Sequence, residues 1–190
     1  TMADVSQRFN HEVYNIAVSL IRKFDERVSS IPDILKLTLG EPDFNTPEHV
    51  KKSGVQAIEQ NFSHYSGMAG LADVRQAASL FLKNKYQLDY DFQSEVLVTI
   101  GATEAISASL LATLEPGDKV ILPAPIYPGY EPVIHLAHAQ PIYLDTTDND
   151  FVLAPEVLEA ALKEHGEQVK AVILNYPSNP TGVCLLYTSP

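Results

Sequence analysis

The chain has 190 residues, of which 45% are hydrophobic and 19% charged, a composition typical of a soluble globular protein of one domain or slightly more. Its formal net charge of −11 argues against nucleic acid as a partner, because an acidic surface repels phosphate backbones. The single cysteine, Cys184, excludes a disulfide framework and a cysteine-rich metal site. No apolar run is long enough to cross a bilayer and no secretory signal is visible, so we expect a cytoplasmic protein with no membrane partner.

The first half of the chain predicts helices joined by loops. An apolar stripe of Ile16, Leu20, Ile21 and Phe24 predicts a helix over residues 9–28. Residues 35–47 alternate apolar and polar side chains and then break.

Two further helices follow in this half. Thr46 as N-cap, Pro47 at the first helical position and an acid in the first turn predict a helix that ends near Gln60. After a loop, residues 71–85 predict a helix whose apolar face is formed by Val74, Ala78, Phe81 and Leu82.

The second half alternates strands and helices at short spacing. We expect strands at 95–100, 118–123, 140–145 and 170–176, with helices within 102–114, 127–139 and 154–165. This order predicts a mainly parallel sheet covered by helices, in which ligands bind at the carboxyl ends of the strands. The loops after Ile100, Leu122, Asp145 and Leu174 are therefore the places to seek chemistry.

The first of these loops is "TIGATEA". Gly101 allows a tight turn, and Ala102 and Thr103 open a helix. Free backbone N–H groups at a helix start, together with a hydroxyl, suit a phosphate. On this evidence alone Thr103 can equally be a simple helix cap, and the glycine patterns of dinucleotide-binding and P-loop proteins are absent from the sequence.

Two more loops carry aromatic and amide groups. In "PAPIYPGYEP", Tyr127 or Tyr130 could stack on a flat ring, or both could be packing residues. In "ILNYPSNPTG", Pro177 and Pro180 restrict the backbone around Asn179, whose amide could bind a ring oxygen or a carboxylate, or merely mark a turn. Together the loops predict a pocket for a flat, phosphorylated ring.

Histidines offer no comparable site. His135 and His138 lie three residues apart on a predicted helix, and we interpret them as surface or packing residues because no third ligand is near in the sequence. We expect no metal.

Five stretches resemble one family: "LTLGEPDFNTPEHV", "HYSGMAGLADVRQA", "VTIGATEAI", "PAPIYPGY" and "LNYPSNPTG". They are similar, in order and at plausible spacing, to the pyridoxal-phosphate (PLP) aminotransferases of fold type I, class I/II. The likeness runs from about Asp4 to Gly182 and is greatest to bacterial aromatic and related amino-acid aminotransferases.

This resemblance implies a fold. It implies an α/β protein with a three-layer αβα architecture and a mainly parallel sheet, of which this chain holds only the N-terminal half. Residues 1–45 would be an N-terminal arm and part of the small domain, and residues 46–183 the first portion of the PLP-binding large domain.

The resemblance also assigns roles to residues. Gly101, Ala102 and Thr103 would hold the phosphate of pyridoxal 5′-phosphate, and Tyr127 would stack on its pyridine ring. Asn179 would bind the 3-oxygen of that ring and help orient the substrate carboxylate.

Three further positions match the family's motifs. Gly40 would lie where the substrate carboxylate approaches the backbone. Tyr65 resembles the tyrosine that reaches the partner subunit's cofactor phosphate, which implies a homodimer with shared active sites. Arg75 matches an arginine that we interpret as structural and ion-paired, and Val74 before it replaces a more usual leucine.

The implied reaction is a transamination between an amino acid and a 2-oxo acid, in which the cofactor acts as electron sink. The family's Schiff-base lysine, the aspartate beside the pyridinium nitrogen and the substrate-binding arginine all lie downstream of "NPTG". None of the lysines present lies in a matching motif, so we expect this chain by itself to be inactive.

The last seven residues, 184–190, depart from the family. "CLLYTSP" is apolar and abrupt, and it can be back-translated as a common transposase sequencing adapter. We therefore expect Cys184 to Pro190 to be a non-native tail of a longer, two-domain enzyme.

Three other functions stay open. A PLP-dependent C–S lyase would use the same loops with a different substrate pocket. An aminotransferase-like effector domain of a regulator would carry a basic winged-helix segment ahead of this one. A general nucleotide-binding α/β domain would need glycine motifs that are absent here.

Overall fold

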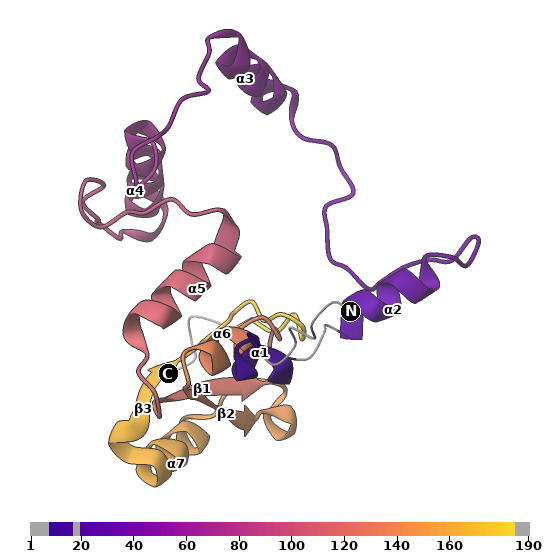
Figure 1. Ribbon diagram of the computed structural model, residues 1–190, viewed down its shortest axis with the longest axis vertical. Helices are drawn as coiled ribbons and strands as arrows, with labels where there is room; N and C mark the ends of the chain where they lie inside the picture. The colour runs from indigo at the N-terminus through magenta and orange to yellow at the C-terminus, as the bar shows by residue number, and fades with distance from the viewer. Residues whose placement is uncertain (1–7, 17–19, 185–190) are drawn as a thin grey trace. The chain divides into compact units, whose positions relative to one another are not determined.

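A computed structural model of the chain describes residues 8–16 and 20–184 (Figure 1). Contacts divide the chain into two compact units. One unit comprises Thr1–Lys23 with Thr103–Pro190, and the other is Phe24–Ala102. The predicted division at residues 45 and 183 stays a prediction.

The start of the chain differs from the predicted single helix over 9–28. The structure has α1 (His11–Asn15) and α2 (Leu20–Val28), with residues 17–19 outside the described part. The backbone of Ile16 is extended, with φ −74° and ψ 110°, and its N–H closes the last turn onto the carbonyl of Val13. Leu20, Ile21 and Phe24 of the predicted stripe are helical, whereas Ile16 lies outside both helices, because periodicity does not reveal a local break.

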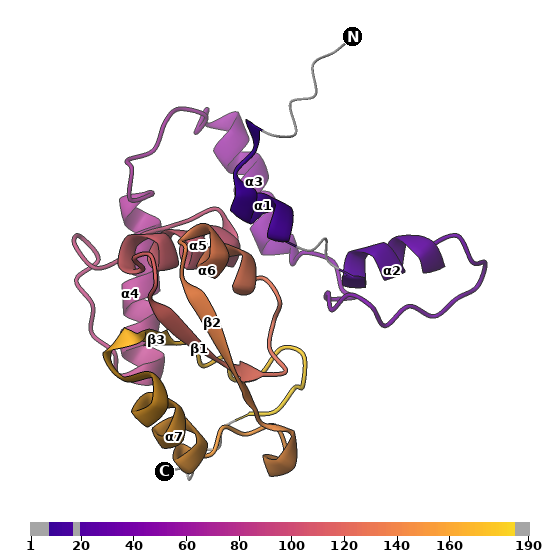
Figure 2. The ribbon, with the colours of Figure 1, turned by 60° about the horizontal axis from the view of Figure 1, so that its bottom comes forward.

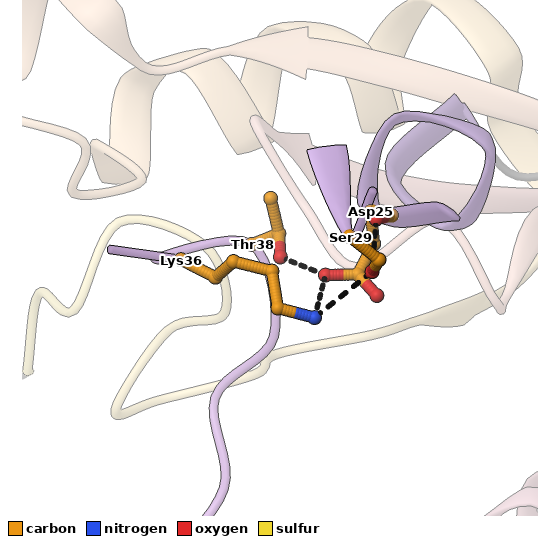
Figure 3. A network of polar contacts seen from close by, with 4 residues as sticks. All are labelled: Asp25, Ser29, Lys36 and Thr38. Atoms are coloured by element: carbon orange, nitrogen blue, oxygen red, sulfur yellow. Dashed lines mark hydrogen bonds and ion pairs between the residues drawn. The ribbon is translucent and has the colours of Figure 1, made fainter. Parts of the chain in front are cut away.

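Within the unit Phe24–Ala102, α2 holds the segment that follows it through a small polar network (Figure 3). The hydroxyl of Thr38 donates to Asp25, and the ammonium of Lys36 lies 3.5 Å from the same carboxylate and 3.0 Å from the hydroxyl of Ser29. The intervening Leu37 is 88% exposed. The side chains of Lys36 and Thr38 thus bind residues of α2, whereas the apolar side chain between them is exposed, in line with the predicted alternation of polar and apolar residues.

Two more helices complete this unit, α3 (Glu48–Glu59) and α4 (Ala72–Tyr86), close to the predicted positions. The predicted N-cap at Thr46 is wrong. Pro47 is the N-cap, because its carbonyl accepts the first helical hydrogen bonds, from Val50 and Lys51. Proline at this boundary costs no hydrogen bond, since the first N–H groups of a helix have no intrahelical partner.

The predicted strand at 95–100 is also wrong, because this segment belongs to no sheet in the described residues. A strand requires a continuous ladder with a neighbour. Here the N–H of Val98 bonds the carbonyl of Ala69, and the side chain of Ile100 is exposed.

The other unit contains a parallel sheet of three strands in the order β2-β1-β3 (Figure 2). Its strands are β1 (Lys119–Ala124), β2 (Gln140–Asp145) and β3 (Val169–Val172). The first two match the prediction to within one residue, whereas the strand predicted at 170–176 ends already at Val172. Register pairs Ala124 with Asp145, so the carboxyl ends of β1 and β2 are level. This unit therefore has the parallel βαβ organisation that the spacing predicts.

The core of this unit is built around β1. Val120, Ile121 and Leu122 are consecutive and almost fully buried, which means that both faces of the central strand are covered. The helices around it are α5 (Gly101–Thr113), α6 (Glu131–Leu136) and α7 (Pro155–His165). The cluster on one face comprises Leu110, Leu114, Val120, Leu122, Tyr130, Val133, Ile134, Ala137 and Ala139.

Candidate cofactor site

The turn into α5 offers backbone N–H groups. Gly101 has a positive φ of 76°, a conformation that favours glycine, and the next residues enter the helix directly. Gly101, Ala102 and Thr103 are all exposed. The hydroxyl of Thr103 makes no hydrogen bond to any residue that the structure describes, so it does not cap the helix. A helix start with exposed N–H groups and an unengaged hydroxyl fits an anion such as a phosphate.

The loop after β1 presents an aromatic ring. Tyr127 is 37% exposed, and its ring meets that of Tyr130 edge to face, with centroids 5.5 Å apart and planes at 87°. Tyr130 is buried, and burial followed by the neighbouring Tyr127 raises the pKa of its phenol. Of the two alternatives that the sequence left for these tyrosines, Tyr130 is a packing residue and Tyr127 retains an accessible ring.

A cavity of about 260 Å³ lies beside Tyr127. Glu131 and Tyr143 also line it. Tyr143 is 48% exposed, and its partial burial, followed by a hydrogen bond to Glu131 and the charge of that carboxylate, raises its pKa to about 12. The cavity wall is therefore a neutral phenol beside a carboxylate, and a flat ring could enter along the face of Tyr127.

The loop after β3 folds onto itself and onto a neighbouring segment. The N–H of Ser178 bonds the carbonyl of Val183 at 2.7 Å, and the N–H of Gly182 bonds the carbonyl of Ser178 at 2.8 Å. The hydroxyl of Tyr176 accepts from the N–H of Leu153 at 3.2 Å. Asn179 is exposed within this closed loop, so its amide is free to meet a ligand.

The loop after β2 has a structural role that the sequence did not reveal. Thr146 is buried, and both its N–H and its hydroxyl donate to the carbonyl of Ala124, the last residue of β1. The N–H and the hydroxyl of Thr147 lower the pKa of Asp145. A threonine directly after a strand was the available signal, and it braces the end of β1 from which the Tyr127 loop departs.

The loops after β1, β2 and β3 leave the same edge of the sheet, because parallel strands end together. Pro125, Asn175 and Ser178 from the loops after β1 and β3 line one small cavity together with Thr146. Tyr127 lines the 260 Å³ cavity, whereas Thr103 and Asn179 are exposed side chains outside its lining.

The remaining predicted residues belong to the other unit. Tyr65 is fully exposed and lines a hollow of about 630 Å³ that Val98 and Ile100 also line. Gly40 is exposed, with open space where a side chain would be. Arg75 donates to the backbone carbonyls of Phe92 at 2.7 Å and Gln93 at 3.3 Å, which fits the predicted structural role, whereas the predicted ion pair is not seen among the described residues.

Neither histidine forms part of a metal site. His135 lies 3.5 Å from Glu131, and His138, beyond the end of α6, lies 3.7 Å from Glu12. Across the described residues, no group of three histidine, cysteine or acidic side chains could hold a metal ion. No helix in that part of the chain is both long and apolar enough to cross a membrane.

The parallel sheet with helices around it defines the class, an α/β protein, and Tyr127 and Asn179 lie on loops at the carboxyl end of the strands, where such proteins bind ligands. The family model of aminotransferase class I and II matches residues 32–186. The chain belongs to this family, whose members are PLP-dependent enzymes, and it corresponds to their N-terminal half.

Among its relatives, the probable N-acetyl-LL-diaminopimelate aminotransferase of Bacillus subtilis is 46% identical over 176 residues, covering 93% of this chain and 44% of that protein. Aspartate aminotransferase of Pyrococcus abyssi is 35% identical, covering 88% of this chain and 42% of that protein. The solved N-succinyldiaminopimelate aminotransferase of Mycobacterium tuberculosis superposes with a TM-score of 0.86 at 31% identity, covering 94% of this chain and 46% of that chain. The sequence thus spans less than half the length of these relatives, and the sheet and its helices are part of their αβα domain.

Proposed function

We propose that the full-length protein containing this chain is a PLP-dependent aminotransferase that moves an amino group from an amino acid to a 2-oxo acid. The observation that carries the proposal is the start of α5, where Gly101 turns the chain and Thr103 offers a hydroxyl with no partner in the described structure. Membership of a PLP-dependent family supports the phosphate of pyridoxal 5′-phosphate as the anion for this helix start.

Each loop has a distinct task in this proposal. The first N–H groups of α5 and the hydroxyl of Thr103 bind the cofactor phosphate, Tyr127 supports one face of the pyridine ring, and the amide of Asn179 donates to the ring oxygen. When bound, pyridoxal 5′-phosphate supplies the electron sink that allows the Cα proton of the amino acid to leave. Gly40 would let the substrate carboxylate approach the backbone, with Asn179 helping to orient it. The enzyme would work in the cytoplasm as a homodimer, with Tyr65 acting on the partner's cofactor.

The amino donor is a narrower proposal. The 46% identity to a probable N-acetyl-LL-diaminopimelate aminotransferase exceeds the 33% identity to the aromatic-amino-acid aminotransferase 2 of Thermococcus litoralis. We therefore place an acylated diaminopimelate ahead of an aromatic amino acid as donor.

Turnover by the full-length protein tests the function. The purified protein, loaded with pyridoxal 5′-phosphate, is given N-acetyl-LL-diaminopimelate, aspartate or phenylalanine, each with and without a 2-oxo acid. Amino transfer that requires the 2-oxo acid supports the proposal, and the preferred donor tests the narrower one. A parallel assay with cystathionine and no 2-oxo acid tests the lyase, since cleavage of its C–S bond with release of a thiol, a 2-oxo acid and ammonia would instead identify that activity.

The chain of 190 residues should behave differently from its parent. Because the family's cofactor-binding lysine lies downstream of the region matched here, borohydride treatment with pyridoxal 5′-phosphate should fix the cofactor to one lysine of the full-length protein and to no single lysine of this chain. Specific labelling of one lysine in the 190-residue chain would contradict its predicted inactivity.

A further inference from the structure

The ring of Tyr127 lies in the space that a side chain at residue 129 would occupy. A Cβ atom built on Gly129 would be 2.2 Å from Cε1 of Tyr127, 2.6 Å from its Cζ and 2.8 Å from its hydroxyl oxygen. Carbon atoms that are not bonded approach to about 3.5–4.0 Å, so any side chain at this position would displace the ring.

The reason for glycine here is space rather than backbone conformation. The φ of Gly129 is outside the left-handed region, unlike that of Gly101 or Gly117. Alanine can therefore adopt this backbone without strain. The three atoms nearest to an added methyl group all belong to the tip of the Tyr127 side chain, so that side chain would have to turn to relieve the overlap.

The opposite constraint on the ring comes from Tyr130. That side chain is anchored in the core and presents itself edge-on to Tyr127 at 5.5 Å between centroids. Tyr127 is thus confined by its own turn on one side and by a core residue on another. What remains free is the part of the ring that borders the 260 Å³ cavity.

We propose that Gly129 is a positioning residue for the cofactor: by lacking a side chain it lets the Tyr127 ring lie back over the turn, and so sets the plane on which the pyridine ring stacks. This inference rests on the proposed role of Tyr127 in binding pyridoxal 5′-phosphate. Gly129 itself needs no contact with the cofactor.

The test uses the full-length protein labelled with 3-fluorotyrosine. The resonance of Tyr127 is assigned from its loss in Tyr127→Phe, and it is then followed in Gly129→Ala without cofactor. We expect this resonance to shift, and the dissociation constant for pyridoxal 5′-phosphate to rise roughly two- to tenfold, the range of an aromatic stacking contact. Gly54→Ala, where an added Cβ meets nothing within 4 Å, is the matched control and should change neither.

A second pair of variants distinguishes a change in the position of the Tyr127 ring from a general disturbance of the fold. In Tyr127→Ala, the further change Gly129→Ala should leave cofactor affinity as it is, because no ring remains to be displaced. Gly129→Ser should unfold at a temperature similar to that of Gly129→Ala, and it should likewise shift the Tyr127 resonance and raise the dissociation constant for the cofactor.

The outcomes are distinguishable. An unmoved Tyr127 resonance in Gly129→Ala, or an equal loss of cofactor affinity in the Tyr127→Ala background, would overturn the positioning role. A shifted resonance with unchanged cofactor affinity in both Gly129→Ala and Tyr127→Ala would instead overturn the proposed contact of Tyr127 with the cofactor.

Discussion

Thr103 is the residue at which the proposed chemistry is most easily tested. In the proposed site its hydroxyl would add one hydrogen bond to those that the N–H groups of the α5 start can give a phosphate, and it has no other partner in the described structure. A hydrogen bond to a charged group contributes about 1.5–3 kcal/mol, which corresponds to roughly a ten- to hundredfold change in affinity.

We therefore expect Thr103→Val in the full-length protein to weaken the binding of pyridoxal 5′-phosphate by about tenfold or more. Equilibrium dialysis against the free cofactor measures this. Thr113→Val at the other end of α5 is the control, since that hydroxyl bonds the carbonyl of Ser109 at 2.8 Å. Equal weakening by the two variants would show that the helix, and not the hydroxyl, was affected.

Tyr143 makes stability depend on alkaline pH. Burial and Glu131 raise its pKa from 10.0 to about 12 in the folded protein, so the unfolded chain loses this proton first as pH rises. Between these two values the folded state binds more protons than the unfolded state, and stability must fall with increasing pH.

Tyr143→Phe should consequently flatten the loss of stability between about pH 10 and 12, as followed by urea unfolding at several pH values. An unchanged slope in Tyr143→Phe would mean that this phenol titrates alike in both states.

The positions of Tyr127 and Asn179 after strands, and of Thr103 at a helix start, are readable from the sequence pattern, whereas their proposed contacts with a cofactor stay predictions. The sequence pattern did not identify Thr146 or Gly129. The role of Thr146 depends on a carbonyl 22 positions away in the chain, and that of Gly129 on the direction in which one ring turns. Neither is a property of local composition.

At the level of elements, the loop that carries Tyr65 is joined to the segment before α5 by a close contact of two backbones. Gly70 has a φ of 90°, and a Cβ on it would lie 2.6 Å from Cβ of Val98. The carbonyl of Ala69 accepts the N–H of Val98 at 3.0 Å. Glycine is thus required here for both its conformation and its size.

Gly70→Ala should lower the free energy of unfolding of the full-length protein by at least about 2 kcal/mol, because strain and overlap add. Urea denaturation gives the value. At Gly67 an added Cβ meets only the carbonyl oxygen of Gly70 at 3.9 Å, so Gly67→Ala should change stability by less than about 0.5 kcal/mol. If both variants were equally stable, the close contact would not exist in solution.

The three strands of the sheet were predictable from the sequence, whereas the segments that stay outside the sheet were not. The apolar run of β1, the alternation of β2 and the helices between them have local signatures. The segment 95–100 has the composition of a strand, yet a strand exists only where a partner offers a ladder, and none does so in the described residues. Likewise, α1 ends before Ile16 although the helical spacing of apolar residues continues from Ile16 to Phe24.

For the whole molecule, the proposal implies that each active site draws on two subunits. A dimer of one Tyr65→Ala subunit and one Thr103→Val subunit should then contain one site with both residues intact and one with neither. We expect about half the activity of the unmodified dimer from the isolated hybrid, and little from either parent variant. If Tyr65 served its own subunit, both hybrid sites would be damaged and activity would stay low.

The most direct measurement is a crystal structure of the full-length protein grown with pyridoxal 5′-phosphate. The account predicts the phosphate at the start of α5 beside Thr103, the pyridine ring on the face of Tyr127 and its ring oxygen next to the amide of Asn179. A cofactor bound elsewhere, or these three side chains pointing into separate clefts, would contradict it.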